Sequence, residues 1–527
     1  MPRPADPYPV NAEPQKRVAV IGSGIAGLTA AHLLSRRYHV TLIEREEVLG
    51  MDAHSKTSHN ARMDIPLRVF SESYYPNLCR LYRSIGVAFG TADYSFSLVD
   101  DCRGGGAYFR YVNLLVRGLA LPLPSPTLLL APQRLPRYLR LAYQFGRFLR
   151  SSPAQVALPG MGDLCLEDFL AANGYAQAFG PDLLYPMLSV VCTCSYASVR
   201  TYPAALIVDY FAGKYGLSGA QCRAHEGTRE AVAKLAQPVA RRVTGAVPPP
   251  YYRERERESR EGAEIGFSRR GPRDGRSPRF HRFSSRPRSR RISADLGATV
   301  REVRPSQAGG RPHVEWSSGG GADGATSHRE AFDEVVVATQ VSAARRLLRP
   351  AAEASEGADR DVYDALGSFR CEKFRVLLHT DASLMPARRR DWSPLNLVVS
   401  PTGSAASVTV WMNAIDEKLR QSLSAPVFQT WNPVTEPRPE AVEADVAFER
   451  PIVDPAAVRA MEKLARCQGR GSLWLVGSHT RCCSPVSAGF FTPFSSSRSA
   501  RTCVARCRSS RTASLPPSRW PSGSAST

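Results

Sequence analysis

The feature that most constrains the fold is a strand–glycine–helix–strand unit near the N-terminus, KRVAVIGSGIAGLTAAHLLSRRYHVTLIERE, residues 16–46. Residues 18–21 form a continuous apolar run rich in β-branched side chains, which is typical of a strand buried on both faces of a parallel sheet. Glycines follow as GxGxxG, then a helical pattern over 25–37 and a second strand over 39–43. Together these features predict a dinucleotide-binding βαβ unit that opens an α/β fold.

The three glycines have separate roles in such a unit. Gly22 permits the tight turn, Gly24 lets the backbone approach a pyrophosphate, and Gly27 lets the helix lie close to the strand. The positive end of the helix dipole then faces the phosphates. Glu44, about twenty residues after the first glycine, is placed to accept hydrogen bonds from ribose hydroxyls. The unit therefore predicts a dinucleotide site and leaves NAD and FAD both open.

The order of the remaining segments favours FAD. A polar loop to about Met63 is followed by an amphipathic helix and a helical middle section with apolar residues at three- and four-residue spacing. Strand patterns return after residue 291, and AFDEVVVATQ contains a second fully buried strand over 334–339. Flavin oxidoreductases interrupt their nucleotide domain in this way, and the chain has no second glycine unit between a strand and a helix. We therefore expect FAD.

The net charge of +21 is concentrated in two segments. Residues 241–291 hold 16 arginines and 6 acidic residues, a net charge of +10, and residues 463–527 hold 10 basic residues and no acid, another +10. A basic nucleic-acid face would spread over helices and strands, with aromatic side chains among the arginines. Residues 241–291 are instead a low-complexity polar tract, so we expect a disordered insertion. A basic nucleic-acid-binding protein stays open as an alternative.

Composition excludes several classes of protein. The hydrophobic content of 43% is that of a globular protein. The chain lacks a run of about eighteen apolar residues, which a membrane-spanning helix requires, and residues 1–15, expected to be disordered, lack the apolar core of a secretory signal. We therefore expect a cytoplasmic protein whose 12 scattered cysteines are reduced. No metal is expected, since no His/Cys cluster has metal-ligand spacing.

Several motifs resemble one family. VAVIGSGIAGLTAAHLL, DIPLRVFSESYYPNLCRLYRSIGV, HTDASLMP, TWNP and LWLVGSH occur in this order between residue 16 and about His479. They resemble FAD-dependent oxidoreductases of the flavin-containing amine oxidase superfamily, specifically the subgroup associated with cyclopropane-fatty-acid synthase. The resemblance implies a two-domain α/β flavoprotein, in which a Rossmann-like FAD-binding domain carries an inserted α+β substrate domain.

The two expected domains are each built from separate segments of the chain. The FAD-binding domain would comprise residues 16–80, 292–345 and 455–480, and the substrate domain, mostly helical with a mixed sheet, residues 81–240 and 346–454. The disordered N-terminus (1–15), the Arg-rich insertion (241–291) and the C-terminal tail (481–527) lie outside both. The expected cofactor-binding residues are Gly22, Ser23, Gly24, Ile25, Ala26, Gly27, Glu44, Arg45, Gly50, Ala338, Thr339, Gly477 and Ser478.

Two departures from the family pattern concern cofactor binding. The family follows its ribose-binding acid with a Gly-Gly pair, whereas VLGMDAHS has Gly50 alone. The family also ends in a helix whose N-terminus faces the flavin pyrimidine. Here GSH at 477–479 is followed by an anomalous tail without acids or periodicity, which is typical of a slipped reading frame. A flavin-binding protein without activity therefore stays open as a second alternative.

Candidates for catalysis are few. Lys373 resembles the lysine that amine oxidases often place beside flavin N5, although an exposed strand-edge lysine fits the sequence equally well. His379 and Asp381 could form an acid–base pair, but we expect them to hold the end of a strand and the following turn. Trp392, Trp411 and Trp431 could line an apolar substrate pocket, although large aromatic residues are more often part of a core.

The sequence leaves the substrate open between an amine and a lipid acyl chain, and the electron acceptor between oxygen and an unknown partner. Hydride transfer to flavin N5 is the expected reaction. Residues 108–150 are basic and apolar without acids, so peripheral contact with a membrane surface is one interpretation. The preferred interpretation is an ordinary pair of substrate-domain helices joined by a proline-rich connection.

Overall fold

A computed structural model describes most of the chain. It covers residues 16–100, 106–116, 119–124, 128, 132–155, 161, 164–212, 221–237, 239–241, 292–307, 309–319, 326–354, 357–400 and 406–480. The expectations for residues 1–15, for nearly all of the Arg-rich insertion 241–291 and for the tail 481–527 lie outside these residues.

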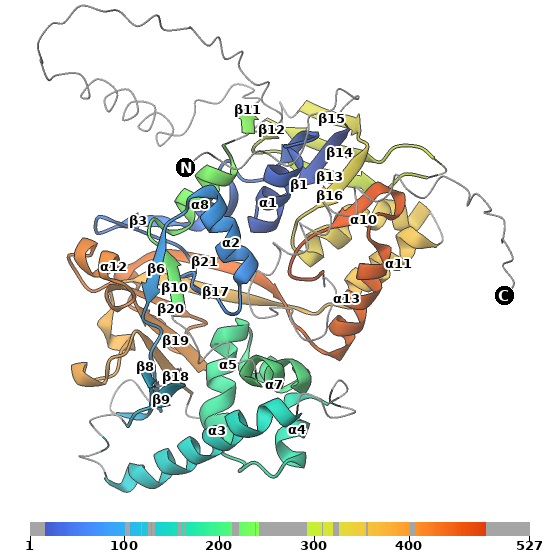
Figure 1. Cartoon of the computed structure of the whole chain (residues 1–527). Helices are drawn as coiled ribbons and strands as arrows, with labels where there is room; N and C mark the ends of the chain where they lie inside the picture. The colour runs from blue at the N-terminus through green and yellow to red at the C-terminus, as the bar shows by residue number, and fades with distance from the viewer. Residues whose placement is uncertain are drawn as a thin grey trace, which may run out of the picture.

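A six-stranded parallel sheet forms the first large sheet of the molecule (Figure 1). Across the sheet its strands are β11 Val239–Arg241, β12 Ile292–Asp295, β2 His39–Ile43, β1 Arg17–Ile21, β16 Glu334–Val337 and β22 Leu473–Leu475. All neighbouring pairs run parallel. The strands expected near 18–21, 39–43 and 334–339 are therefore confirmed, and the third ends at Val337.

Both faces of this sheet are covered, which explains why its central strands are almost entirely apolar. Val18 and Val20 lie in a core with the helices α1 (Ile25–Leu34), α2 (Pro76–Ile85) and α8 (Gly227–Leu235). Ala19 and Ile21 lie in a second core on the other face. This core includes α10 (Val341–Ala354) and an antiparallel sheet of β13 Thr299–Arg304, β14 His313–Ser318 and β15 Thr326–Ala331.

Helix α1 ends at Leu34 and not at the predicted residue 37. The Ser35 hydroxyl donates to the backbone oxygen of His32 at 2.9 Å, and such a bond competes with continuation of a helix. Helix α11 (Ala358–Gly367) lies beside α10, and α13 (Pro455–Cys467) lies beside α11 (Figure 1).

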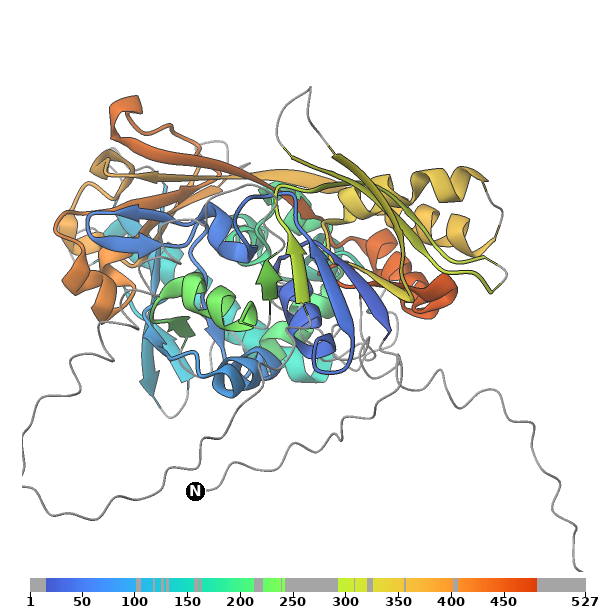
Figure 2. The ribbon, with the colours of Figure 1, turned by 90° about the horizontal axis from the view of Figure 1, so that it is seen from above.

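An eight-stranded mixed sheet forms the second large sheet. Its strands are, in order, β21 Val442–Pro451, β17 Cys371–His379, β20 Phe428–Trp431, β19 Ala406–Trp411, β18 Leu395–Val399, β7 Phe96–Val99, β8 Ala107–Val116 and β9 Leu119–Pro122. Only the β18–β7 pair is parallel among the described strands of this sheet. From above, strands drawn in orange run from this sheet toward the six-stranded sheet (Figure 2).

Helices gather on one side of the eight-stranded sheet (Figure 1). They are α3 Leu135–Gln155, α4 Leu166–Ala172, a π-helical turn Gly180–Leu184, α5 Tyr185–Cys192, α6 Tyr196–Arg200 and α7 Ala204–Ala212. The expected helix pair over 108–150 was wrong in its first half, because β8 and β9 form an antiparallel hairpin there. Tyr108, Phe109, Tyr111 and Val112 favour a strand, since aromatic and β-branched side chains fit a pleated surface.

Shorter elements complete the described chain. The loop expected up to Met63 contains a 3-10 turn, Gly50–His54, and a hairpin of β3 Lys56–Ser58 and β4 Ala61–Met63, whose turn residues His59 and Asn60 both have positive φ. A three-stranded sheet consists of β5 Phe70–Ser71, β10 Gln221–Ala224 and β6 Phe89–Ala92. The remaining elements are α12 Glu417–Ser422 and 3-10 turns at Pro132–Arg134, Ala382–Leu384, Arg389–Asp391, Met412–Ala414, Pro439–Ala441 and Arg470–Ser472.

The Arg-rich insertion joins two strands of the parallel sheet. β11 ends at Arg241, β12 begins at Ile292, and the two strands pair in parallel. Both strands that flank the insertion therefore belong to the parallel sheet. Parallel neighbours need a crossover connection of a dozen or more residues, and in the sequence residues 242–291 make this connection.

Buried polar contacts join the two halves of the molecule. Gln429 on β20 donates to the backbone oxygen of Asp64 at 2.8 Å and accepts from the backbone N–H of Leu67 at 2.9 Å. The Asp64 carboxylate in turn accepts from the N–H and hydroxyl of Thr228, at the start of α8. In the described ranges, no helix is long and apolar enough to cross a membrane.

Candidate cofactor site

The candidate site lies at the carboxyl edge of the six-stranded sheet. Gly22 follows β1, Glu44 follows β2, Ala338 follows β16, and Gly477 follows β22 by one residue. Because the four strands are parallel neighbours, their carboxyl ends meet at one edge. The chain passes from β1 to β2 on one side while β16 and β22 pair on the other, so the loop after β1 occupies the switch point where α/β sheets bind ligands.

The glycine loop is shaped for close backbone contact. Gly22 has φ of 94°, and a Cβ atom there would lie 2.8 Å from the Ala338 oxygen. At Gly27 a Cβ atom would lie 1.8 Å from the Gly22 oxygen, so the first and third glycines are required by packing within the protein. At Gly24 a Cβ atom would meet nothing within 4 Å among the described residues beyond its own neighbours in the chain and helix. The open side of the loop therefore lies over Gly24.

This open side fits a pyrophosphate group. Gly24 is the N-cap of α1 and offers no side-chain hydrogen bond to the first helical N–H groups, and the first turn holds no acidic residue. Free N–H groups and the helix dipole at such an end favour an anion. Ile25 and Ala26 are buried in this first turn. The residues present thus fit the phosphates of a dinucleotide.

Glu44 is held by the glycine loop itself. Its Oε2 atom accepts from both the N–H and the hydroxyl of Ser23 at 2.6 Å, and Oε1 accepts from the Glu46 N–H at 3.0 Å. The Ser23 hydroxyl also accepts from the Gly50 N–H at 2.8 Å. A carboxylate offers about four acceptor positions, so Glu44 retains room for a ribose hydroxyl. This clamp between Ser23, Glu44 and Gly50 was not expected from the sequence.

The other predicted cofactor residues lie around this clamp. Gly50 has φ of 69°, and Arg45 is exposed beside Glu46, with which it forms an ion pair at 3.0 Å. The Ala338 N–H donates to the Ile21 oxygen at 2.8 Å and extends the sheet ladder, with Thr339 next to it. The Gly477 N–H donates to the Thr480 hydroxyl at 3.2 Å, and Ser478 lies within this turn.

Lys373 lies on β17 of the other sheet, and its side chain is exposed. It pairs in register with Glu449, whose carboxylate accepts from the Ser342 hydroxyl at 2.5 Å. Ser342 lies in the first turn of α10, shortly after Thr339, so this end of β17 lies near the candidate site. Phe374, the next residue, is buried on the opposite side of the strand. A catalytic role for Lys373 stays a prediction.

His379 and Asp381 stabilise the end of β17. His379 is fully buried, its Nε2 lies 2.7 Å from the Thr430 hydroxyl, and its Nδ1 accepts from the Asp381 N–H at 3.2 Å. Burial lowers the pKa of His379 to about 4. Burial raises the pKa of Asp381, but hydrogen bonds from Arg438 and Ser383 outweigh it and lower that pKa to about 2. The geometry agrees with the preferred interpretation of a strand end and turn.

The three tryptophans form two groups, with Trp411 and Trp431 on strands of the eight-stranded sheet and Trp392 before β18. Trp392 and Trp411 meet edge to face at 5.3 Å, and the Arg389 guanidinium lies 3.9 Å and 4.5 Å from their ring centroids. Trp431 instead packs against Phe374 at 5.8 Å. Trp392 and Trp411 therefore stack with an arginine, while Trp431 belongs to the core.

Arg68 and Arg450 form a pair of arginines that the sequence did not predict. Arg450, at the end of β21, has a buried Nε atom without a hydrogen-bond partner among the described residues. Burial, together with the nearby Arg68 guanidinium, lowers the pKa of Arg450 to about 10, while Tyr202 and Tyr75 act in the opposite sense. A lone arginine in a strand looks solvent-exposed in the sequence, so only the three-dimensional neighbourhood identifies this pair.

Comparisons with known proteins place this geometry among related folds. A family model described as an NAD(P)-binding Rossmann-like domain matches residues 20–85, which include the glycine loop and Glu44. A search of curated proteins found no match. Among solved structures, cyclohexylamine oxidase from Brevibacterium oxydans IH-35A is 12% identical, with a TM-score of 0.53 over 94% of this chain and 100% of that one.

Two further solved structures are similar over comparable lengths. A CLA-producing fatty acid isomerase from P. acnes is 14% identical, with a TM-score of 0.52 over 93% of this chain and 98% of that one. An oxidoreductase from Methanosarcina mazei is 10% identical, with a TM-score of 0.53 over 93% and 100%. At these identities the likeness shows the fold: a Rossmann-like domain with an inserted α+β domain, as in amine-oxidase-like two-domain flavoproteins.

Proposed function

We propose that the chain is an FAD-dependent oxidoreductase of the amine oxidase type. The observation that carries the proposal is the opening over Gly24, bounded by the N-terminus of α1 and by the Ser23–Glu44–Gly50 clamp. When bound, FAD would supply a hydride acceptor at N5 for an organic substrate. We also propose that it belongs to the subgroup associated with cyclopropane-fatty-acid synthase.

The chain's own residues would bind and orient the cofactor. The α1 N-terminus would bind the pyrophosphate. Glu44 would accept a hydrogen bond from a ribose hydroxyl, at an acceptor position that Ser23 and Glu46 leave open. Ala338, Thr339, Gly477 and Ser478 would line the same edge. Lys373 would act near flavin N5, because Glu449, its partner in register, contacts the first residues of α10.

The proposed division into two domains follows the two large sheets. The FAD-binding domain comprises 16–80, 292–345 and 455–480, and the substrate domain 81–240 and 346–454. Two observations support moving these boundaries: β11 pairs with β12 in the parallel sheet, and α11 lies beside α10 and α13. We therefore assign β11 and α11 to the FAD-binding side.

The Arg68–Arg450 pair favours an acidic lipid over an amine among the two substrate classes. The two guanidinium groups bring two positive charges into a partly buried place, against the single Asp64 carboxylate near Arg68, and this excess favours a carboxylate over a protonated amine. The Nε atom of Arg450 would gain a partner from such a carboxylate. We propose a fatty acyl substrate with oxygen or another acceptor for the electrons, and a membrane as the source of that substrate.

Denaturation of the purified chain tests the cofactor. FAD should be held without a covalent bond. Denaturation should then release the flavin into the supernatant, which would show its absorption band in the blue. A colourless supernatant from folded protein would overturn the proposal. A coloured pellet with a clear supernatant would show covalent attachment and would contradict the mode of binding proposed here.

A further inference from the structure

Helix α3 carries an apolar stripe on its solvent side. Leu135, Leu139 and Tyr143 follow one another at four-residue spacing, which places them on one face, and 40%, 56% and 68% of their surfaces are exposed. Leu123, shortly before the helix, is 37% exposed. Among the described residues, these four account for all exposed large hydrophobic side chains except Val48 and Val434.

The opposite face of α3 is already occupied by the core. Tyr138, Leu141, Phe145 and Phe148 are buried against the body of the protein. A surface helix normally has polar residues on its outer side, so apolar residues on both sides need a second explanation. Contiguous exposed apolar surface marks a site of interaction with another protein, a ligand or a membrane.

Along the chain, the segment that contains the stripe carries charge of a single sign. Residues 102–162 contain 8 arginines and no acidic residue. Arg140 and Arg150 are exposed on α3 and form no ion pair in the described part of the chain. Arg147, by contrast, is used internally and donates to the backbone oxygens of Asn173 and Gly174. The outer side of α3 therefore presents apolar groups together with unpaired positive charge.

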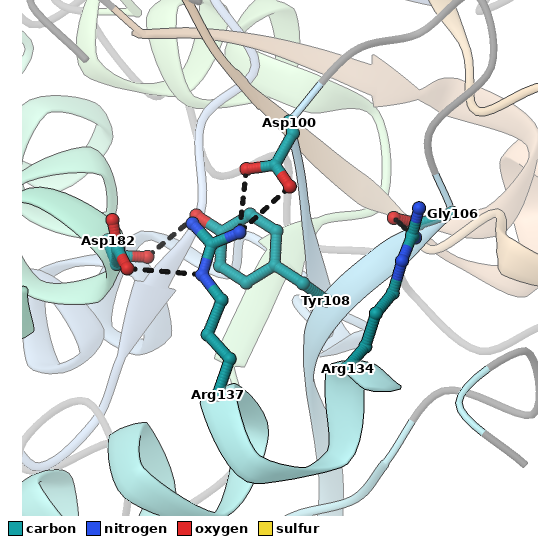
Figure 3. Close-up of polar contacts among 6 residues, drawn as sticks. All are labelled: Asp100, Gly106, Tyr108, Arg134, Arg137 and Asp182. Carbon is teal, nitrogen blue, oxygen red and sulfur yellow. Dashed lines mark hydrogen bonds and ion pairs between the residues drawn. The ribbon is translucent and has the colours of Figure 1, made fainter. Parts of the chain in front are cut away.

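The first turn of α3 is fixed to the body by Arg137 (Figure 3). The Arg137 guanidinium bonds both Asp100 oxygens at 2.9 Å and 2.8 Å and Asp182 Oδ2 at 3.1 Å. It also lies 3.8 Å from the centroid of the Tyr108 ring, and Tyr108 donates to the Asp182 backbone oxygen at 2.7 Å. Arg134 donates to the Gly106 oxygen at 2.8 Å. The stripe therefore lies on an anchored helix, and its exposure is not the fraying of a loose segment.

We infer that the outer face of α3, defined as Leu135, Leu139, Arg140, Tyr143 and Arg150, docks on an anionic lipid bilayer. Interfacial helices combine apolar residues that enter the acyl boundary with arginines that meet anionic head groups. The helix has 21 residues, about 30 Å of length along a membrane plane. Figure 1 shows α3 along the lower side of the molecule, away from the six-stranded sheet.

Charge argues against a second copy of the chain as the occupant of this face. In a symmetric dimer the same patch meets itself, so Arg140 and Arg150 would face arginines without a carboxylate between them. The docking inference depends on the proposed oxidoreductase function in one respect only: that function would explain the docking as a supply of lipid substrate. Binding to vesicles can be measured without turnover, so failure of one proposal leaves the other standing.

Cosedimentation of the full chain with vesicles tests the docking. We expect binding to phosphatidylglycerol/phosphatidylcholine vesicles and much weaker binding to pure phosphatidylcholine. The double variant L139Q/Y143Q keeps both charge and helix propensity, and its partition coefficient should fall about tenfold or more, because two apolar side chains no longer leave water. V434Q, at the exposed hydrophobic residue far along the chain, is the matched control and should bind like the unchanged protein.

The outcomes separate docking from other causes. Both variants should retain flavin, whereas Gly24→Val should lose flavin and retain vesicle binding. Unchanged partitioning of L139Q/Y143Q would overturn the inference, because the Arg-rich segment 241–291 would then account for binding. The inference would also be overturned if light scattering detected dimers of the unchanged protein and the double variant no longer formed them. Hydrogen exchange should slow over residues 135–155 on anionic vesicles, and slowing confined to other segments would contradict the docking face.

Discussion

The carboxyl edges of the parallel sheet and the end of β17 in the mixed sheet use polar residues in opposite ways. At the parallel sheet, Ser23 and Glu44 form a clamp that leaves an opening over Gly24. At the end of β17, His379 and Asp381 are buried and bond to one another, to Thr430 and to Ser383. At β17, His379 and Asp381, which have side chains suited to catalysis, thus stabilise the structure. At the parallel sheet, a loop of glycines forms the candidate site.

The largest expected effect breaks the parallel-sheet side of this comparison. Gly27→Ala would place a Cβ atom 1.8 Å from the Gly22 oxygen, so α1 must move from the sheet. We expect the free energy of unfolding to fall by more than about 3 kcal/mol, measured by urea denaturation. Gly146→Ala, in the middle of α3 with open space around it, is the control and should be neutral or stabilising. Equal stability of the two variants would contradict the close approach.

A smaller effect concerns buried histidine at the edge of the parallel sheet. His479 is buried and its Nε2 has no partner among the described residues, and burial lowers its pKa to about 4. The unfolded chain binds the proton near pH 6.5, so stability from this group is present above pH 6.5 and is lost as pH falls toward 4. His479→Phe should remove up to about 3 kcal/mol of the stability change between pH 6.5 and pH 4, measured by urea denaturation at each pH. An unchanged slope would show that His479 titrates normally.

The clamp itself can be sharpened by a paired substitution. Glu44→Gln keeps the shape but turns one acceptor of Ser23 into an amide, so FAD binding should weaken by about 1–3 kcal/mol, the range for losing a bond to a charged acceptor. Glu46→Gln changes the same charge at an ion pair with Arg45 outside the clamp, and should change affinity little. Fluorescence titration of the apoprotein with FAD measures both. Equal losses would assign the effect to net charge instead of the clamp.

The smallest expected effect concerns the Arg-rich insertion. Residues 247–290 can be replaced by a flexible linker of about a dozen residues, long enough to return from the end of β11 to the start of β12. Stability should change by less than about 1 kcal/mol, since loop closure depends only weakly on length. Binding to heparin should fall and lose most of its salt dependence. Loss of folding on excision would assign the insertion to the architecture.

The parallel sheet was predictable because its signals are local. The apolar run before Gly22, the glycine spacing and the acid at Glu44 each need only a few neighbouring residues, and the structure confirms the strands they predict. The second half of residues 108–150 also formed the expected helix. Residues 108–122 did not, because aromatic and apolar residues fit a buried helix and a strand equally, and only pairing with β7 decides between them.

Contacts between distant segments could not be read from the sequence. The clamp joins Ser23 to Gly50, and the arginine pair joins residues 68 and 450. Neither the spacing nor the residue types single out these partners, since each depends on how β2, β4 and β21 are arranged in three dimensions. The catalytic lysine stays a prediction for the same reason.

The flavin content of two matched glycine variants tests the central claim most directly. Gly24→Val and Gly146→Val both add a branched side chain where the described protein leaves open space, but only Gly24 lies over the proposed pyrophosphate site. Purified in parallel, Gly146→Val should carry as much released flavin per chain as the unchanged protein, while Gly24→Val should carry almost none at equal folded content by circular dichroism. Full flavin in folded Gly24→Val would contradict the placement of the cofactor at this edge.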